Sequence, residues 1–364
     1  MLIDNQTPGR DGPPCGRGSV HVFGTVFLDL VFSELSAPPR PGTEVRAKGL
    51  GVSPGGTANV AVALARLGVG VQLSAAFGDD AFGHYLWGAL EREGVDLACS
   101  RRIDGWTTPL TVSMAYGRDR SMVTYEEPSP WDPYAAAPEV QTADAFVVSL
   151  GNADRGWLER LRAAGGTVVA DVGWDPAETW TLDLLDKLPL VDVFLPNLAE
   201  ATAYSRQPDA ARAAVALARH GPLVVVKLGA SGALAAGGGL AEPVAVPALA
   251  VDALDTTGAG DVFDAGFVFG TVAGWPVARR LRFASLCAGE SVRFAGGSFS
   301  APCWRDLRAW WERQADPEGR ASYAFLAELI EACPPGPTCR RPCASMAYPI
   351  EETPAGSPTG AERA

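Results

Sequence analysis

Short apolar segments alternate with helix-like segments through the second half of the chain. Four runs, DAFVVSL, TVVADV, VDVFLPN and LVVVKLG, carry no polar alternation, which predicts strands buried on both faces. Helices are predicted near residues 155–164, 179–187 and 209–219. Strands and helices in this order form parallel sheets covered on both sides. The predicted fold is therefore a three-layer α/β/α sandwich with a mostly parallel central sheet.

The first half of the chain adds features that do not fit this rhythm. The run SVHVFGTVF predicts a buried first strand that bends at Gly24, and NVAVALARL predicts a helix packed on the sheet. Residues near 43–50 and 107–127 instead hold extended segments, and the second of these alternates Thr, Ser and Tyr with apolar residues. Such segments are typical of a sheet with one wet face. We assign them to a small β-sheet lid that is able to close over a ligand.

The acidic balance of the chain limits its partners. The 364 residues carry a net charge of −12, so the surface repels phosphate backbones and anionic lipids. We expect a small-molecule partner and neither nucleic-acid nor membrane binding. No apolar run is long enough to span a bilayer, and the N-terminus lacks the apolar stretch of a signal peptide. These absences predict a cytoplasmic protein.

Both ends of the chain lack hydrophobic periodicity. Residues 1–18 and 333–364 are rich in proline and glycine, which predicts a disordered leader and a disordered tail. Residues 19–332 are predicted to form one domain that includes the lid. The seven cysteines contain no CxxC pair, and those of the tail fit no zinc module.

The stretch ALDTTGAGDVFDAGFVFG, residues 253–270, holds the strongest chemical signal. Gly258, Ala259 and Gly260 precede an apolar helix, and small residues at a helix N-terminus leave backbone N–H groups open to a phosphate. An acidic residue there would repel that phosphate unless it has a separate task. Asp261 is suited to accept the proton of an attacking hydroxyl. The alternative is that Asp261 is only the helix N-cap.

The same stretch resembles the C-terminal signature of the ribokinase-like, or PfkB, carbohydrate kinases. The resemblance implies that Asp261 is the catalytic base and that Gly258, Ala259 and Gly260 form the anion hole. It also implies that Asp255 and Thr257 contribute to the monovalent-cation site that activates some members. With further motifs in order, the resemblance covers about residues 20–300.

A second motif, SPGGTANVAVALARLG, resembles the N-terminal signature of this family. The resemblance implies that Gly55, Gly56 and Asn59 hold the substrate hydroxyls, and that Asp29 after the first strand binds them too. A carboxylate suits this task because it accepts two hydroxyl hydrogen bonds. The span from the glycine pair to Asn59 is one residue shorter than in the family, and Thr57 replaces a small residue. Without the family, the motif could be only a turn and a helix cap.

The nucleotide side carries two weaker motifs. Asn197 and Glu200 match the family's NxxE pattern, which implies that they position magnesium through its waters; a helix cap and a solvated glutamate are the alternative. In LVVVKLGASG, the resemblance implies that Lys227, Gly229 and Gly232 lie at the nucleotide phosphates, although Lys227 stands where many members have threonine. We assign no adenine contact to Ser285 and no catalytic role to Asp79 or Asp80.

The sequence therefore predicts ATP-dependent phosphorylation of a hydroxyl on a small sugar or sugar-like substrate. The cofactors implied are ATP, Mg²⁺ and an optional K⁺. Two alternatives stay open: a catalytically inactive sugar- or nucleotide-binding regulator on the same scaffold, and a nucleoside kinase. A nucleotide-cofactor oxidoreductase lacks support, since no GxGxxG follows the first strand. A homodimer is left open because some relatives pair through the flap.

Overall fold

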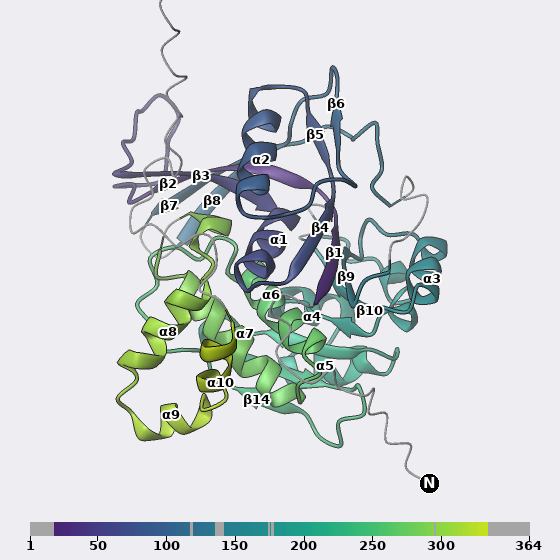
Figure 1. Ribbon diagram of the computed structural model, residues 1–364. Helices are drawn as coiled ribbons and strands as arrows, with labels where there is room; N and C mark the ends of the chain where they lie inside the picture. The colour runs from purple at the N-terminus through teal and green to yellow at the C-terminus, as the bar shows by residue number, and fades with distance from the viewer. Residues whose placement is uncertain are drawn as a thin grey trace, which may run out of the picture.

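The computed structural model describes residues 18–333, apart from residues 117–118, 135–141, 174, 176–177 and 295. The leader predicted for residues 1–18 and the tail predicted for residues 333–364 lie outside the described residues, except for Gly18 and Cys333. The described chain forms one central sheet covered by helices, with a small separate sheet beside it (Figure 1).

The central sheet has eight strands in the order β14-β13-β12-β11-β10-β9-β1-β4. Every neighbouring pair from β4 to β12 is parallel, and only β13 runs in the opposite direction, antiparallel to β12 on one side and to β14 on the other. The mostly parallel sheet predicted from the apolar runs is thus confirmed. The strands are β1 Ser19–Phe23, β4 Gly70–Ser74, β9 Ala145–Ser149, β10 Thr167–Asp171, β11 Val193–Phe194, β12 Leu223–Lys227, β13 Ala233–Ala236 and β14 Val244–Val246.

Helices cover both faces of this sheet, which completes the predicted three layers. Alternate residues of β12 enter different cores: Val225 packs with α1, α6 and α7, whereas Val224 and Val226 pack with α3, α4 and α5. Within the described part of the chain, no helix is both long and apolar enough to cross a membrane. The helices are α1 Thr57–Arg66, α2 Ala81–Arg92, α3 Arg155–Ala163, α4 Leu198–Ser205, α5 Ala210–Ala218, α6 Ala259–Val272, α7 Val277–Ser291, α8 Trp304–Arg313, α9 Pro317–Ser322 and α10 Leu326–Ala332.

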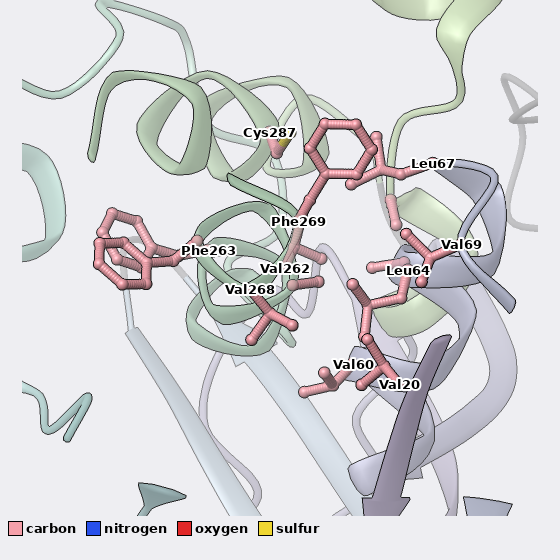
Figure 2. Packing of buried hydrophobic residues seen from close by; sticks show 14 of the residues in the cluster. Val20, Val60, Leu64, Leu67, Val69, Val262, Phe263, Val268, Phe269 and Cys287 are labelled. Carbon is pink, nitrogen blue, oxygen red and sulfur yellow. The ribbon is translucent and has the colours of Figure 1, made fainter. Parts of the chain in front are cut away.

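Helices α1 and α6 pack against each other on one face of the sheet. Figure 2 shows Val60 and Leu64 of α1 on the side of α6 that carries Val262 and Val268. All four side chains are at least 95% buried. This packing fixes the position of one helix N-terminus relative to the other, which matters for the site described below.

The small sheet has the order β3-β2-β7-β8. Its strands are β2 Val26–Ser33, β3 Gly49–Gly56, β7 Leu110–Tyr116 and β8 Asp119–Tyr125. The hairpin predicted within 107–127 is present, but the strand expected near 43–50 begins only at Gly49. That strand runs through SPGG because it pairs along its whole length with β2, although glycine and proline are depleted in strands. A separate pair, β5 Ala76–Gly78 and β6 Arg101–Ile103, lies beside α2.

Two elements differ from the prediction for local steric reasons. The single strand expected over SVHVFGTVF is split into β1 and β2 at Gly24, where φ is +151° and a Cβ would lie 2.3 Å from Thr57 Cγ2. The helix expected near 179–187 is wrong: only 3₁₀ turns, Leu182–Leu184 and Leu188–Leu190, are formed. Trp180 has a positive φ at the start of this segment, with its backbone N–H donating to Asp175. Helices near 155–164 and 209–219 are confirmed.

Arg66 joins α1 to the end of α2 through a buried ion pair, and to the segment after α7 through backbone carbonyl groups. Arg66 donates to both carboxylate oxygens of Glu93 at 2.8 and 2.9 Å and to the carbonyl oxygens of Phe299 and Ala301. Both charged side chains are almost fully buried. Because the guanidinium has partners on both sides, it joins α1, α2 and the 3₁₀ turn Gly297–Ser300 into one unit.

His21 in β1 makes folding stability sensitive to acid. Burial lowers the pKa of His21 from 6.5 to about 4, against the opposing charge of Asp96. The native state therefore excludes a proton that the unfolded chain binds, and stability is lost as the pH falls from 6.5 towards 4. We expect His21 to account for about 3 kcal/mol of that loss.

Urea unfolding at pH 7 and pH 4.5 measures this effect. In His21→Gln the difference between the two pH values should shrink, because no imidazole must then be kept neutral. Replacement of the exposed His220 by Gln is the control and should leave the wild-type difference unchanged. An equal pH difference in wild type and His21→Gln would contradict the assignment.

Candidate active site

A cavity of about 620 Å³ lies at the carboxyl ends of β10, β11 and β12. Ligands bind at this edge of an open α/β sheet because the loops after parallel strands converge there. Nine of the predicted site residues line the cavity: Asn197, Glu200, Lys227, Gly229, Gly232, Gly258, Ala259, Gly260 and Asp261. Asp29, Gly55, Gly56, Asn59, Asp255 and Thr257 are not among its lining residues.

The N-terminus of α6 faces this cavity without a side chain that caps it. Gly258 is the N-cap with φ +73°, a conformation that favours glycine, and Ala259 and Gly260 form the start of the helix. Asp261 follows in the first turn, so it is not the N-cap that the alternative interpretation required. The small residues leave this helix end open to an anion.

Asp261 is tied to the other half of the site by one hydrogen bond. Asn59 Nδ2, from the first turn of α1, donates to Asp261 Oδ2 at 2.9 Å. A Cβ on Gly258 would lie only 3.3 Å from the Asn59 side chain, so glycine allows the two helix ends to approach. Asn59 Oδ1 is buried and accepts no hydrogen bond. The packing of α1 on α6 therefore places Asn59, a predicted substrate-binding residue, against the predicted base.

Asp29 and the glycine pair lie together on the small sheet. Asp29 of β2 faces Ser53 of β3 across the antiparallel pair, and its side chain is largely buried. A Cβ on Gly55 would lie 2.2 Å from the Asp29 carboxyl carbon, so the carboxylate occupies the space of the missing side chain. Gly56 has a different reason: its φ is +61°, and a Cβ would lie 2.4 Å from the Thr25 carbonyl oxygen. Gly55 thus leaves space for the Asp29 carboxylate, whereas Gly56 is required by the backbone conformation at its own position.

Asn197 and Glu200 form a capping box at the start of α4. The Glu200 amide donates to Asn197 Oδ1, and Glu200 accepts from the Asn197 amide and from its Nδ2. Burial, and then the negative charge of Asp171, raise the pKa of Glu200 to about 7. Asp171 lines the same cavity, and its Oδ1 is buried with no hydrogen-bond partner. These carboxylate oxygens fit the hard-oxygen preference of Mg²⁺ held through water.

Lys227, at the end of β12, makes ion pairs. Its Nζ donates to Asp171 Oδ2 at 3.1 Å and to both carboxylate oxygens of Asp264 at 3.1 and 2.8 Å. Burial alone would lower the pKa of Lys227, but the charges of Asp171 and Asp264 outweigh it and raise that pKa above its usual value. The side chain is therefore a fixed, protonated cation rather than a nucleophilic amine.

The two glycines after Lys227 shape the turn that follows β12. Gly229 and Gly232 both have positive φ, and a Cβ on Gly232 would lie 2.0 Å from the Val246 carbonyl oxygen. Both residues line the cavity. Together with Ala230, these glycines give the cavity a wall of small residues, which leaves room for a bulky ligand.

Asp255 closes the loop that leads into α6. Its Oδ1 accepts from the Thr257 amide at 2.9 Å, and its Oδ2 accepts from the Gly296 amide at 3.1 Å. The carboxylate is buried, so its charge is held by backbone dipoles from two segments. This arrangement places the Asp255 carboxylate beside the turn at Gly258 but outside the cavity.

Comparison with known proteins agrees with this geometry. The sequence model of the pfkB family of carbohydrate kinases matches residues 17–304. This chain belongs to the PfkB family of carbohydrate kinases. As a member of this family, the kinase is a phosphotransferase that uses an alcohol group as acceptor.

The alignments with relatives of this kinase cover nearly the whole length of those relatives. It is 30% identical over 319 residues to a fructokinase from Klebsiella pneumoniae, covering 80% of this chain and 99% of that protein. It is 26% identical over 301 residues to a ribokinase from Haemophilus influenzae, covering 79% and 96%. The structure of aminoimidazole riboside kinase from Salmonella enterica matches with a TM-score of 0.66 at 26% identity, covering 80% and 99%. The ribokinase-like fold is thereby confirmed.

Three polar residues near the kinase's site were missed by the sequence reasoning. Asp171 ends a predicted strand, so the rule that ligands bind after parallel strands pointed to it. Asp264 lies inside an apolar helix and gave no such signal. Ser53 Oγ is fully buried without a hydrogen-bond partner, 2.8 Å from where a Cβ on Gly297 would lie.

Asp80, which had no assigned role, supports the fold. It is the N-cap of α2 and accepts hydrogen bonds from the Gly83 amide and from the amide and hydroxyl of Thr108. Although partial burial opposes them, these bonds hold the pKa of Asp80 below its usual value. Asp80 thus joins α2 to the strand that enters the small sheet.

Gly55→Ala tests the contact with Asp29. The added methyl must displace the carboxylate, so the KM for the acceptor should rise about tenfold or more, the cost of one charged hydrogen bond. Nucleotide affinity, measured by titration calorimetry, should stay unchanged because the cavity is elsewhere. Gly151→Ala, which meets nothing within 4 Å, is the control. An unchanged acceptor KM in Gly55→Ala would remove Asp29 from the acceptor site.

Proposed function

We propose that this kinase transfers the γ-phosphoryl group of ATP to a hydroxyl of a small sugar or sugar-like substrate, with Asp261 as general base. The observation that carries the proposal is the position of Asp261. It lies in the first turn of an uncapped helix, lines the cavity, and accepts a hydrogen bond from Asn59 on the substrate side. A base must lie between the acceptor and the phosphate.

Asp261 lies between two groups of residues, and we assign a different ligand to each group. Asp29 and Asn59 would hold acceptor hydroxyls, and the cavity would take the nucleotide, its phosphates near Gly229, Gly232 and the start of α6. Asp261 removes the hydroxyl proton as the oxygen attacks the γ-phosphorus and the bond to ADP breaks. Backbone N–H groups of residues 258–260 stabilise charge on the transferring group. Magnesium would be held through water by Asn197 and Glu200 and would neutralise phosphate charge.

Relatives support the choice of nucleotide. The structure of ribokinase from Arabidopsis thaliana, 25% identical to this chain, is a complex with ribose and ATP. That of aminoimidazole riboside kinase is a complex with its riboside and an ATP analog. The acceptors named by the relatives are sugars or a riboside, so a nucleoside acceptor stays a second candidate. ATP consumption across a panel of sugars and nucleosides separates these, and binding without turnover would favour an inactive regulator.

Asp261→Asn tests the general base. The amide cannot accept the proton, so kcat should fall by about 10³-fold or more, while its oxygen still accepts from Asn59. ATP affinity and melting temperature should therefore stay close to wild type.

Asp252→Asn is the matched control, because Asp252 is an exposed aspartate near the same turn and does not line the cavity. Its kcat should equal that of wild type. Near-normal turnover in Asp261→Asn would refute the assignment.

A monovalent cation beside Asp255 and Thr257 is a finer part of the proposal. The buried charge of Asp255, next to the turn at Gly258, supports a site for K⁺ built with nearby carbonyl oxygens. Replacing K⁺ by tetramethylammonium should lower kcat several-fold. Asp255→Asn should remove most of that difference. A wild-type rate that is the same in both salts would contradict the cation site.

A further inference from the structure

Lys227 is the one lysine of this chain that lines the cavity. The sequence has three lysines, and Lys48 and Lys187 do not contribute to its wall. The Lys227 side chain is 12% exposed, and its partner Asp264 only 2%. A Cβ on Gly260 would lie 3.7 Å from Lys227 Nζ, so the ammonium sits beside the start of α6. A buried cation at this position needs a functional explanation.

The hydrogen bonds of Lys227 leave it little capacity to reach a phosphate. An ammonium has three N–H donors, and Lys227 Nζ contacts one oxygen of Asp171 and both oxygens of Asp264. Asp264 is buried within α6, about one turn after Asp261. Lys227 therefore acts from a fixed place, through its charge, rather than by moving to a ligand.

The surrounding carboxylates have the spacing of metal ligands. One oxygen each of Asp171, Asp261 and Asp264 lie within 4.8 Å of one another. Oxygens that surround a Mg²⁺ or Mn²⁺ ion at about 2.1 Å from the metal lie within the same range of each other. Lys227 Nζ is 2.8 to 3.1 Å from two of these three residues. The ammonium thus already contacts two of the three carboxylates that a divalent ion would share.

We propose that Lys227 is a positioning residue whose ammonium takes the place of a divalent cation among Asp171, Asp264 and Asp261. It offsets part of the carboxylate charge and keeps metal ions from coordinating Asp261 directly. This inference rests on the proposed role of Asp261 as base. A carboxylate oxygen that coordinates a metal ion donates the lone pair that should accept the hydroxyl proton. A lysine supplies positive charge at this place without claiming that lone pair.

Mn²⁺ binding to the nucleotide-free, full-length protein tests the inference without any turnover. Electron paramagnetic resonance of free Mn²⁺ measures the number of ions bound per chain. Lys227→Met removes the charge at similar length, and we expect it to bind one more Mn²⁺ than wild type. The double variant Lys227→Met/Asp264→Asn should lose that ion again. Equal Mn²⁺ stoichiometry in wild type and Lys227→Met would overturn the proposal.

A second comparison does not depend on the folding of Lys227→Met. Wild type and Asp264→Asn should give the same Mn²⁺ isotherm, because Lys227 already excludes the ion from Asp264. A lower stoichiometry in Asp264→Asn would place a metal ion at this carboxylate in the wild-type protein and overturn the proposal. Neither result depends on whether Asp261 is the base, so failure of the two assignments can be distinguished.

Kinetics at constant Mn²⁺-ATP supply a readout that a purely structural lysine would not move. Raising free Mn²⁺ should inhibit Lys227→Met tenfold or more, because the extra ion captures Asp261, while wild type changes little. Lys187→Met is the matched control, since Lys187 donates to the Leu150 carbonyl oxygen away from the cavity; it should behave as wild type. Activation of Lys227→Met by free Mn²⁺ would show that a metal is tolerated at Asp261 and would overturn the proposal.

Discussion

The hydrogen bond between Asn59 and Asp261 joins residues 202 positions apart, and the arrangement of the site depends on it. Its geometry follows from the packing of α1 on α6, which is secured by buried aliphatic side chains (Figure 2). Arg66 fixes the other end of α1 to Glu93 at the end of α2 and to the carbonyl oxygen of Ala301 in the segment after α7. The short contact between the Asn59 and Asp261 side chains is thus maintained by packing along the whole helix.

A parallel sheet concentrates charge at one edge, and this kinase has to manage that charge. Asp171 ends β10 and Lys227 ends β12, with β11 between them, Glu200 lies in the first turn of α4, and Asp264 lies one turn inside α6. Four carboxylates, counting Asp261, therefore lie around one ammonium. Burial makes each uncompensated charge costly, so the ion pairs of Lys227 offset part of the cost of burying these carboxylates.

The layers of the fold could be predicted because buried parallel strands have a distinctive apolar pattern. Elements whose conformation depends on tertiary contacts could not. Strand β3 passes through SPGG because β2 supplies a partner along its full length, and that partner is not visible from local sequence. The bend at Gly24 could be predicted from the glycine, but its close contact with Thr57 could not. The alternation of strands and helices predicts a helix near 179–187, whereas the structure forms only short 3₁₀ turns there.

The site divides in the same way. Asp261 and the small residues before it could be predicted as a candidate site because they form one continuous motif in the sequence. Asp264 and Ser53 could not, since an aspartate inside a helix and a serine in a glycine-rich strand give no signal until the fold brings them to Lys227 and Gly297. The shortened span before Asn59 has a structural counterpart, because β3 ends at Gly56 and α1 begins at Thr57.

That direct junction has a mechanical consequence. Gly56 still pairs with Val26, while the Thr57 amide and hydroxyl both donate to the Thr25 carbonyl oxygen. Because no linker separates β3 from α1, a rotation of the small sheet relative to α1 would change mainly the two backbone dihedral angles of Gly56. Asp29 and Asn59 thus lie on opposite sides of one short junction, with Asn59 three residues after Gly56, so any change in the angle between the small sheet and α1 would alter the spacing of these two side chains.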